Sequence, residues 1–395
     1  MKKILSIMLT LVLIFSLAAC GGSDQSGGDT TAENAEKSEE SGDSSSEDGT
    51  VEITYATWGM ETEMQEMVDL YNASQNQVHV TLQVTPLSEY GTLMNEVLGT
   101  EEGPDVLWAG LQTRLWGNAG MLAELQDKVT EDQMDLSVFM EYPLKQNYVG
   151  DTLYGIPCYT DSYAICYNKA VFDKYGVEYP KEGWNWNDYE ALAEELNSKI
   201  KAEGGNEFAS ALAINEPAHG TLLLLTCNGA KLYNEDVTAC ALNVPESVEM
   251  LEMVQRMVES GAQADYDTLV ETNAASLFLS GLAGMIIICP DPGANGLFEG
   301  TSVKETLDYI AFPNGPTSGT NYIDTVTMNN IVINSGTTKF DAAWDFVKWY
   351  TTNQEALDAY AKIEWHLPTN VNAFDAWEAS HDYAEVYVEE ADKVV

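Results

Sequence analysis

The chain has 395 residues, 45% of them hydrophobic, and a formal net charge of −45 at pH 7. A surface this acidic repels the phosphates of nucleic acids, so polyanion binding is not an expected role. The length exceeds what one hydrophobic core usually holds, so the sequence predicts two lobes.

Residues 1–19 predict a signal peptide. Two lysines precede an apolar run over 4–19, which is shorter than the roughly 20 residues of a membrane-spanning helix. The run ends in the letters LAAC, with Cys20 last, and this ending resembles the lipobox of bacterial lipoproteins. The resemblance implies that a diacylglyceryl group modifies the Cys20 thiol and that the chain is cut before it. Two acyl chains give stable anchoring, so contact with a membrane is expected through this lipid alone. A plain signal peptide with a chance cysteine is the alternative.

Residues 20–50 predict a disordered acidic linker that begins at the lipidated cysteine. Beyond Cys20 the segment has no aromatic residue and no aliphatic residue larger than Ala, and nine carboxylates accompany one basic side chain, Lys37. Such a segment cannot bury enough apolar surface to fold. We expect it to hold the folded part of the chain clear of the lipid head groups.

Strand and helix patterns alternate from residue 51 onward. An apolar stripe that starts at Met60 and ends at Tyr71 predicts a helix. The other predicted helices span 188–200, 245–258 and 340–350, and the predicted strands span 51–59, 78–84, 104–110, 164–168, 283–289 and 329–334. This order is typical of α/β lobes with mostly parallel sheets flanked by helices.

The spacing of cysteines and histidines indicates no metal site. Besides Cys20 there are five cysteines, which cannot all pair, and four histidines without ligand spacing. We interpret the cysteines mainly as small core residues and leave a Cys227–Cys240 bridge open. The chain has no nucleophile elbow, zinc-protease motif, P-loop or dinucleotide fingerprint. We therefore expect neither a cofactor nor an enzymatic activity.

Eight motifs occur in one order and carry a specific resemblance. They are ITYATWG, GPDVLWAG, LYGIP, YNKAVFDKYGV, WNWNDYEALAEEL, FLSGLAGMIII, AFPNGP and AAWDFVKWYTTNQEAL. Together they resemble the extracellular solute-binding proteins that serve sugar ABC importers, the maltose-binding-protein family, from residue 51 to about residue 370. The resemblance implies a two-lobed periplasmic-binding-protein-like α/β fold of type II with a hinge between the lobes.

The resemblance also implies lobe boundaries and partners. Family members continue for several helices beyond the last residues of this chain, so a truncated C-lobe is an open alternative. The implied protein is a monomer that delivers a sugar or oligosaccharide to permease subunits at the outer face of the cytoplasmic membrane, on a Gram-positive cell surface. The expected N-lobe is 51–158 plus 314–350, and the expected C-lobe is 159–313 plus 351–395.

Three candidate ligand-binding residues follow from where strands end. A sugar has an apolar C–H face and a rim of hydroxyls, which aromatic rings and carboxylates bind. Ligands of open α/β sheets lie at the carboxyl ends of the strands. Trp58 and Glu61 follow the first strand, and Trp108 ends the strand of the PDVLW motif. We expect all three in the ligand-binding site.

The family resemblance implies further site residues. Asp161 lies six residues before the YNK motif, an offset at which the family has a sugar-binding carboxylate, and we expect it to be partly exposed. Tyr159 lies beside it at the expected hinge. The loop NEPAHG resembles a cleft loop of the family and would contribute Glu216 and His219.

Two more candidates lie later in the chain. Asp291 follows GMIIICP, where the family often has a stacking aromatic residue, so it would supply an acceptor in place of a ring. Trp365 precedes HLPT, a loop that commonly returns to the cleft in the family.

The sequence leaves functions other than sugar binding open. An aromatic site with several carboxylates would also bind a polyamine or another organic cation. A secreted carbohydrate-active enzyme and a surface adhesin are alternatives of other classes. Salt distinguishes sugar binding from cation binding, because the affinity for a cation falls steeply with ionic strength and the affinity for a sugar does not.

Overall fold

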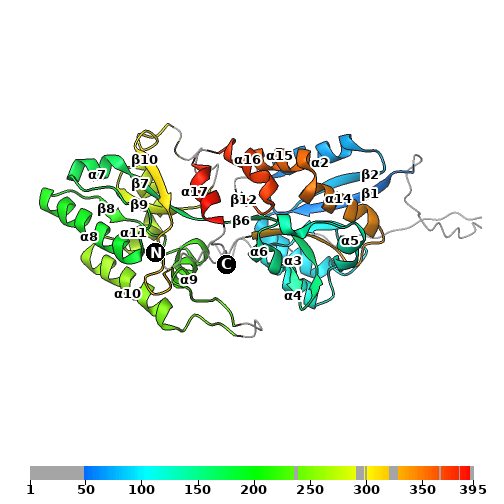
Figure 1. Cartoon of the computed structure of the whole chain (residues 1–395), viewed down its shortest axis with the longest axis horizontal. Coiled ribbons are helices and arrows are strands. Elements are labelled where there is room, and N and C mark those ends of the chain that lie inside the picture. The colour runs from blue at the N-terminus through cyan, green and yellow to red at the C-terminus, as the bar shows by residue number, and fades with distance from the viewer. Residues whose placement is uncertain are drawn as a thin grey trace, which may run out of the picture. The chain divides into compact units, whose positions relative to one another are not determined.

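The computed structural model describes residues 49–234, 239–290, 298, 300–319, 328–363, 366–381 and 383–391. The predicted signal peptide, Cys20 and nearly all of the predicted linker therefore lie outside the described residues. Within them, two main sheets are each covered by helices (Figure 1).

The larger sheet has six strands in the order β12-β6-β11-β3-β1-β2. β1 pairs in parallel with β2 and β3, whereas β11 pairs antiparallel with β3 and with β6. β6 consequently runs in the same direction as β1, β2 and β3, while β11 and β12 run against them. The strands are β1 Val51–Thr57, β2 Val78–Val84, β3 Val106–Trp108, β6 Gly155–Thr160, β11 Met328–Ile333 and β12 Leu367–Pro368.

The smaller sheet has four strands in the order β10-β7-β9-β8. β8 and β9 are parallel, and β7 is antiparallel to both β9 and β10. Its strands are β7 Ala164–Asn168, β8 Phe208–Ser210, β9 Ala283–Ile288 and β10 Leu307–Ala311, and a separate hairpin pairs β4 Tyr148–Val149 with β5 Thr152–Leu153.

The prediction of mostly parallel sheets is wrong for the pairing of the strands. In the described part of the chain, most hydrogen-bonded strand pairs are antiparallel, although most strands of each sheet point the same way. The chain leaves the larger sheet through β6 and continues directly into β7 of the smaller one. It returns through β11, which lies beside β6. Because β6 leads out of the larger sheet and its neighbour β11 leads back into it, the two strands run in opposite directions.

Helices cover both sheets and coincide with the predicted helical segments where those were specified. The first stripe forms α2 and buries Met64, Met67, Val68 and Tyr71, whereas Met60 lies just before the helix with a φ of 54°. The helices are α2 Glu61–Ser74, α3 Leu87–Val97, α4 Thr113–Asn118, α5 Gln126–Glu131, α6 Glu141–Lys145, α7 Lys169–Tyr175, α8 Trp186–Glu203, α9 Leu223–Thr226, α10 Pro245–Ser260, α11 Tyr266–Glu271, α12 Ala274–Leu279, α14 Phe340–Thr352, α15 Gln354–Ile363, α16 Phe374–Glu378 and α17 Ala384–Glu389.

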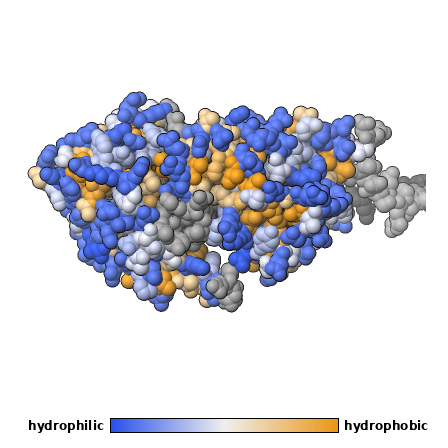
Figure 2. Space-filling model, in the orientation of Figure 1, coloured by the Kyte–Doolittle hydropathy of each residue, from blue (hydrophilic) through white to orange (hydrophobic). Residues whose placement is uncertain are grey.

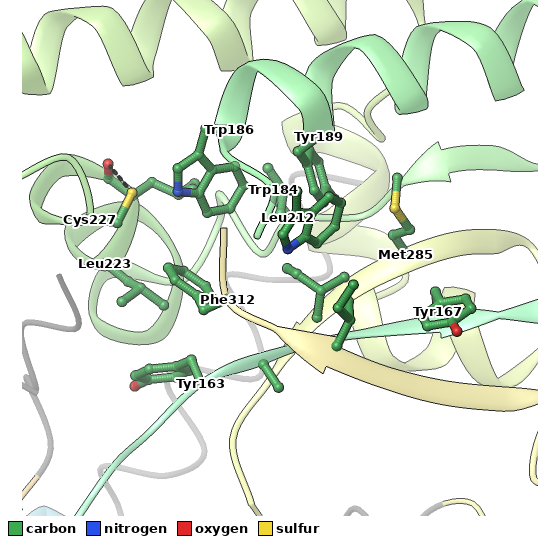
Figure 3. Packing of buried hydrophobic residues seen from close by; sticks show 14 of the residues in the cluster. Tyr163, Tyr167, Trp184, Trp186, Tyr189, Leu212, Leu223, Cys227, Met285 and Phe312 are labelled. Carbon is green, nitrogen blue, oxygen red and sulfur yellow. Dashed lines mark hydrogen bonds between the residues drawn. The ribbon is translucent and has the colours of Figure 1, made fainter. Parts of the chain in front are cut away.

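Each sheet has a hydrophobic core of its own. Helices α2 and α14 supply most of the side chains that pack on the larger sheet. The core against the smaller sheet contains the predicted WNWNDY segment (Figure 3), where Trp186 contacts Phe312 edge-to-face with ring centroids 5.2 Å apart. Asn185 caps α8 there, because its side chain accepts hydrogen bonds from the amides of the first helical turn. Residues of α15 pack into both cores. The exact lobe boundaries stay a prediction.

The visible face is largely hydrophilic, with apolar patches between the polar areas (Figure 2). In the described part of the chain, no helix is both long enough and apolar enough to span a membrane.

Candidate ligand-binding site

The carboxyl ends of three strands place the first candidate residues at one edge of the larger sheet. β1, β3 and β6 run in the same direction, so their ends lie at the same edge. Trp58 directly follows β1, Trp108 is the last residue of β3, and Asp161 directly follows β6. The structure thus places at one edge residues that are more than a hundred positions apart in the sequence.

Trp58 and Trp108 contact each other edge-to-face, with ring centroids 5.1 Å apart. Trp108 is almost fully buried, with 1% of its surface exposed, whereas Trp58 is only partly buried. Trp58 is therefore the more accessible ring of the pair, and Trp108 is the more deeply buried one.

Tyr90 of α3 contacts both tryptophans of this pair. Its hydroxyl donates to the carbonyl oxygens of Trp108 (2.8 Å) and Ala56 (3.2 Å), and its ring contacts Trp58 at 5.2 Å. Burial raises the pKa of the Tyr90 hydroxyl well above its ordinary value, so it stays a donor. The sequence does not predict this role of Tyr90, because nothing in its local sequence distinguishes it from other helix residues that face a core.

Tyr159 extends the aromatic cluster toward β12. Its ring lies edge-on to Trp108 at 6.1 Å and stacks on the imidazole of His366 at 4.0 Å. His366 reaches this position because it precedes β12, and Leu367 of β12 is the register partner of Thr160 in β6. Among the described residues of the HLPT segment, His366 contacts the cluster, through Tyr159.

Asp161 lies in the three-residue connection between β6 and β7. Its carboxylate accepts a hydrogen bond from the Tyr163 hydroxyl (3.2 Å) and lies 3.4 Å from His366 Nε2. The expectation of a partly exposed carboxylate is wrong, since Asp161 is fully buried. All three residues of this connection are buried.

Asparagine residues that open β11 complete the edge. Asn329 is the register partner of Tyr159, and the pairing of β11 with β6 is irregular between Asn329 and Asn330. The Asn329 carboxamide oxygen accepts from the amide of Gly110 (3.3 Å), two residues beyond Trp108. The sequence predicts this strand but not its role at the site, although two polar residues at the start of an otherwise apolar strand are a visible signal.

The remaining candidates are not brought to this cluster by any described contact. Glu61 is exposed at the first residue of α2, and Glu216 is exposed before a π-helical turn, Pro217–Leu222. The side chain of His219 and the residues Asp291 and Trp365 lie outside the described residues.

Within the described ranges, no group of three His, Cys, Asp or Glu side chains is placed to hold a metal ion. Cys227 is buried and Cys240 is exposed, and both are free thiols. The cluster is therefore a set of aromatic faces with one buried carboxylate, which suits binding of a polar organic molecule.

A sequence profile of the bacterial extracellular solute-binding proteins matches residues 58–357, which is most of the chain. The chain belongs to this family. Curated relatives include a putative binding protein of Brucella abortus, 25% identical over 359 residues that cover 88% of this chain and 81% of the relative. A maltotriose-binding protein of Pyrococcus abyssi is 24% identical over 312 residues, which cover 77% of this chain and 62% of that protein.

Solved structures share the fold. The sugar-binding protein MalE of Xanthomonas citri superposes with a TM-score of 0.75 at 18% identity, over 87% of this chain and 86% of that one. A Listeria monocytogenes substrate-binding protein in complex with cycloalternan gives a TM-score of 0.71 at 22% identity, over 88% of each chain. These similarities confirm the predicted family and the predicted two-lobed α/β fold.

Proposed function

We propose that this solute-binding protein binds a sugar or oligosaccharide and delivers it to the permease subunits of an ABC importer. The observation that carries the proposal is the cluster of Trp58, Trp108, Tyr159 and Asp161 at the carboxyl edge of the larger sheet. The partly buried ring of Trp58 suits the C–H face of a sugar, and the carboxylate of Asp161 suits its hydroxyls.

The ligands named for similar proteins point the same way. Solved structures with this fold were determined with cycloalternan, with acarbose and with maltose. The Pyrococcus abyssi relative is a maltotriose-binding protein. Malto-oligosaccharides are therefore the first ligands to test.

The N-terminal sequence supports attachment to the outer face of the cytoplasmic membrane. We infer that residues 1–19 are removed, that Cys20 carries the lipid, and that residues 20–50 are a flexible tether on a Gram-positive cell surface. A Cys20→Ala variant, followed by membrane fractionation, tests this part. The tether is refuted when the variant, with its signal peptide removed, sediments with membranes as completely as the wild type.

The remaining parts of the proposal follow from the sequence and from the family. We propose a monomer whose N-lobe comprises 51–158 plus 314–350 and whose C-lobe comprises 159–313 plus 351–395. The protein acts as a binder, so the sugar it releases is chemically unchanged, which chromatography of the released sugar tests.

A thermal-shift screen of the full chain tests the function. The screen uses maltose, maltotriose, cycloalternan and, as the cationic alternative, spermidine. A ligand at a hundred times its dissociation constant stabilises the folded state by about 2.7 kcal/mol. A shift with at least one sugar and none with spermidine supports the proposal. A shift with spermidine alone, weakened by added salt, would replace it with organic-cation binding.

A further inference from the structure

Two buried N–H donors at the aromatic edge have no partner among the described residues. They are the indole Nε1 of Trp108 and the carboxamide Nδ2 of Asn329. Trp108 is 1% exposed and Asn329 is fully buried. A buried polar group without a partner is costly and uncommon in a native fold, so two of them at one sheet edge require an explanation.

The orientation of the Asn329 carboxamide is fixed by its other atom. Its oxygen accepts from the backbone amides of Gly110 (3.3 Å) and Asn330 (2.9 Å). Both partners are donors, so turning the carboxamide over would set its NH₂ group against two N–H groups. The unpaired atom at Asn329 is therefore the donor.

The neighbouring asparagine shows what a purely structural role looks like. Asn330 uses its whole carboxamide inside the protein, because its nitrogen donates to the Gly110 carbonyl oxygen (2.8 Å) and to Thr113 Oγ1 (3.2 Å). Its oxygen accepts from Asn147 (2.7 Å). Two adjacent asparagines thus differ in one respect, the unused donor of Asn329. The irregular pairing of β11 at this point is of the kind that redirects a side chain next to a binding site.

A second tryptophan gives the same contrast for the indole. Trp116 of α4 is 2% exposed, and its Nε1 donates to the side-chain oxygen of Asn95 at 2.7 Å. The indole N–H of Trp108, equally buried in the same half of the molecule, has no such acceptor.

We propose that Trp108 Nε1 and Asn329 Nδ2 donate hydrogen bonds to acceptor oxygens of the bound molecule. This inference rests on the proposed function and defines the chemistry of its ligand. An ammonium group has three donors and no acceptor, so a polyamine would leave both protein donors unpaired. Hydroxyl, ring and bridging oxygens of a sugar accept hydrogen bonds. We call these two atoms the donor pair. The donor pair therefore favours a neutral, oxygen-rich ligand over an organic cation. The carboxylate of Asp161 would suit either kind of ligand.

Calorimetric titration of maltotriose into the full chain tests the donor pair with matched variants. Trp108→Phe removes the indole N–H and keeps an aromatic ring, and Trp116→Phe makes the same change where the N–H is already paired. We expect Trp108→Phe to weaken binding about tenfold, equivalent to about 1.4 kcal/mol, and to lower the melting temperature, because a smaller ring replaces a buried indole. Trp116→Phe should lower the melting temperature and leave the affinity unchanged.

Trp108→Phe removes part of the ring area along with the N–H donor. Asn329→Asp tests the loss of a donor alone, because it changes no ring. The substitution keeps an oxygen for the amides of Gly110 and Asn330 and replaces the unpaired donor with an acceptor. We expect maltotriose binding to weaken about tenfold and spermidine binding to appear or strengthen. If Asn329→Asp binds maltotriose with the affinity of the wild type, the proposed role of the donor pair is refuted, whatever the affinity of Trp108→Phe. If the wild type binds spermidine and none of the screened sugars, the proposed function itself fails, and the donor pair fails with it.

Discussion

The imidazole of His366 stacks on the phenol ring of Tyr159, with the ring planes 5° apart and the centroids 4.0 Å apart. This contact joins β6, where the chain leaves the larger sheet, to the start of β12, which lies more than two hundred residues later in the chain. His366 also lies 3.4 Å from the carboxylate of Asp161. One histidine therefore holds both an aromatic ring and the buried acceptor of the candidate site.

His366→Ala should weaken maltotriose binding by about 1–2 kcal/mol, or roughly fivefold to thirtyfold, because Tyr159 and Asp161 lose the ring that positions them. Calorimetric titration measures the affinity. His381→Ala is the matched control, since His381 also stacks on an aromatic ring, that of Trp377 at 4.9 Å, but outside the candidate site. Equal affinity losses in the two variants would show a general loss of stability and no specific role for His366.

Asp161→Asn should weaken maltotriose binding by about 1–3 kcal/mol, because the carboxamide is a weaker acceptor than a buried carboxylate and a donor replaces one of its two acceptor oxygens. The loss should be the same at low and high salt, since the proposed ligand is neutral. Titration at two salt concentrations checks this. A penalty that shrinks as salt rises would indicate a cationic ligand.

Glu207 makes the stability of the fold depend on pH. Burial opposes its ionisation, but hydrogen bonds from the Lys174 ammonium and the Tyr175 hydroxyl outweigh burial and lower the pKa of Glu207 from 4.5 to about 2. A folded-state pKa below the unfolded value stabilises the fold above that unfolded value, and the contribution is lost as the pH falls from about 4.5 toward about 2.

Glu207→Gln should therefore lower the melting temperature at neutral pH, and the difference from the wild type should shrink as the pH falls below about 4.5. Glu178→Gln is the control, because Glu178 pairs with Lys181 at 2.6 Å but both side chains are exposed, where an ion pair contributes little. If the difference in melting temperature between Glu207→Gln and the wild type stays constant down to about pH 2, the lowered pKa of Glu207 is contradicted.

The sequence predicted the parts of this protein that depend on local pattern. The stripe of α2, the strand pattern of β1 and the apolar β9 each depend on spacing that is visible within a few residues. Trp58 and Trp108 were predicted for the same reason, because each follows or ends a recognisable strand. The placement of Asp161 was anticipated from its offset to a motif, but its burial was not.

The rest depends on contacts between distant segments. The antiparallel pairing of β11 with β6 follows from the path of the chain between two sheets, which no local pattern encodes. Tyr90 and Asn329 join the site only through partners at Trp108 and Gly110. The roles of Tyr90 and Asn329 depend on hydrogen bonds between segments that are distant in the sequence, so only the folded chain shows them.

The central claim, that a sugar binds against the aromatic edge, is tested most directly by calorimetric titration of maltotriose into the wild type and Trp58→Ala. Trp58 is the partly buried ring of the cluster, so its removal should take away stacking area without emptying a core. We expect saturable binding to the wild type and a loss of about 2–3 kcal/mol in the variant, or roughly thirtyfold to a hundredfold in affinity. Saturable binding with the same affinity in both proteins would contradict the claim and place the sugar elsewhere.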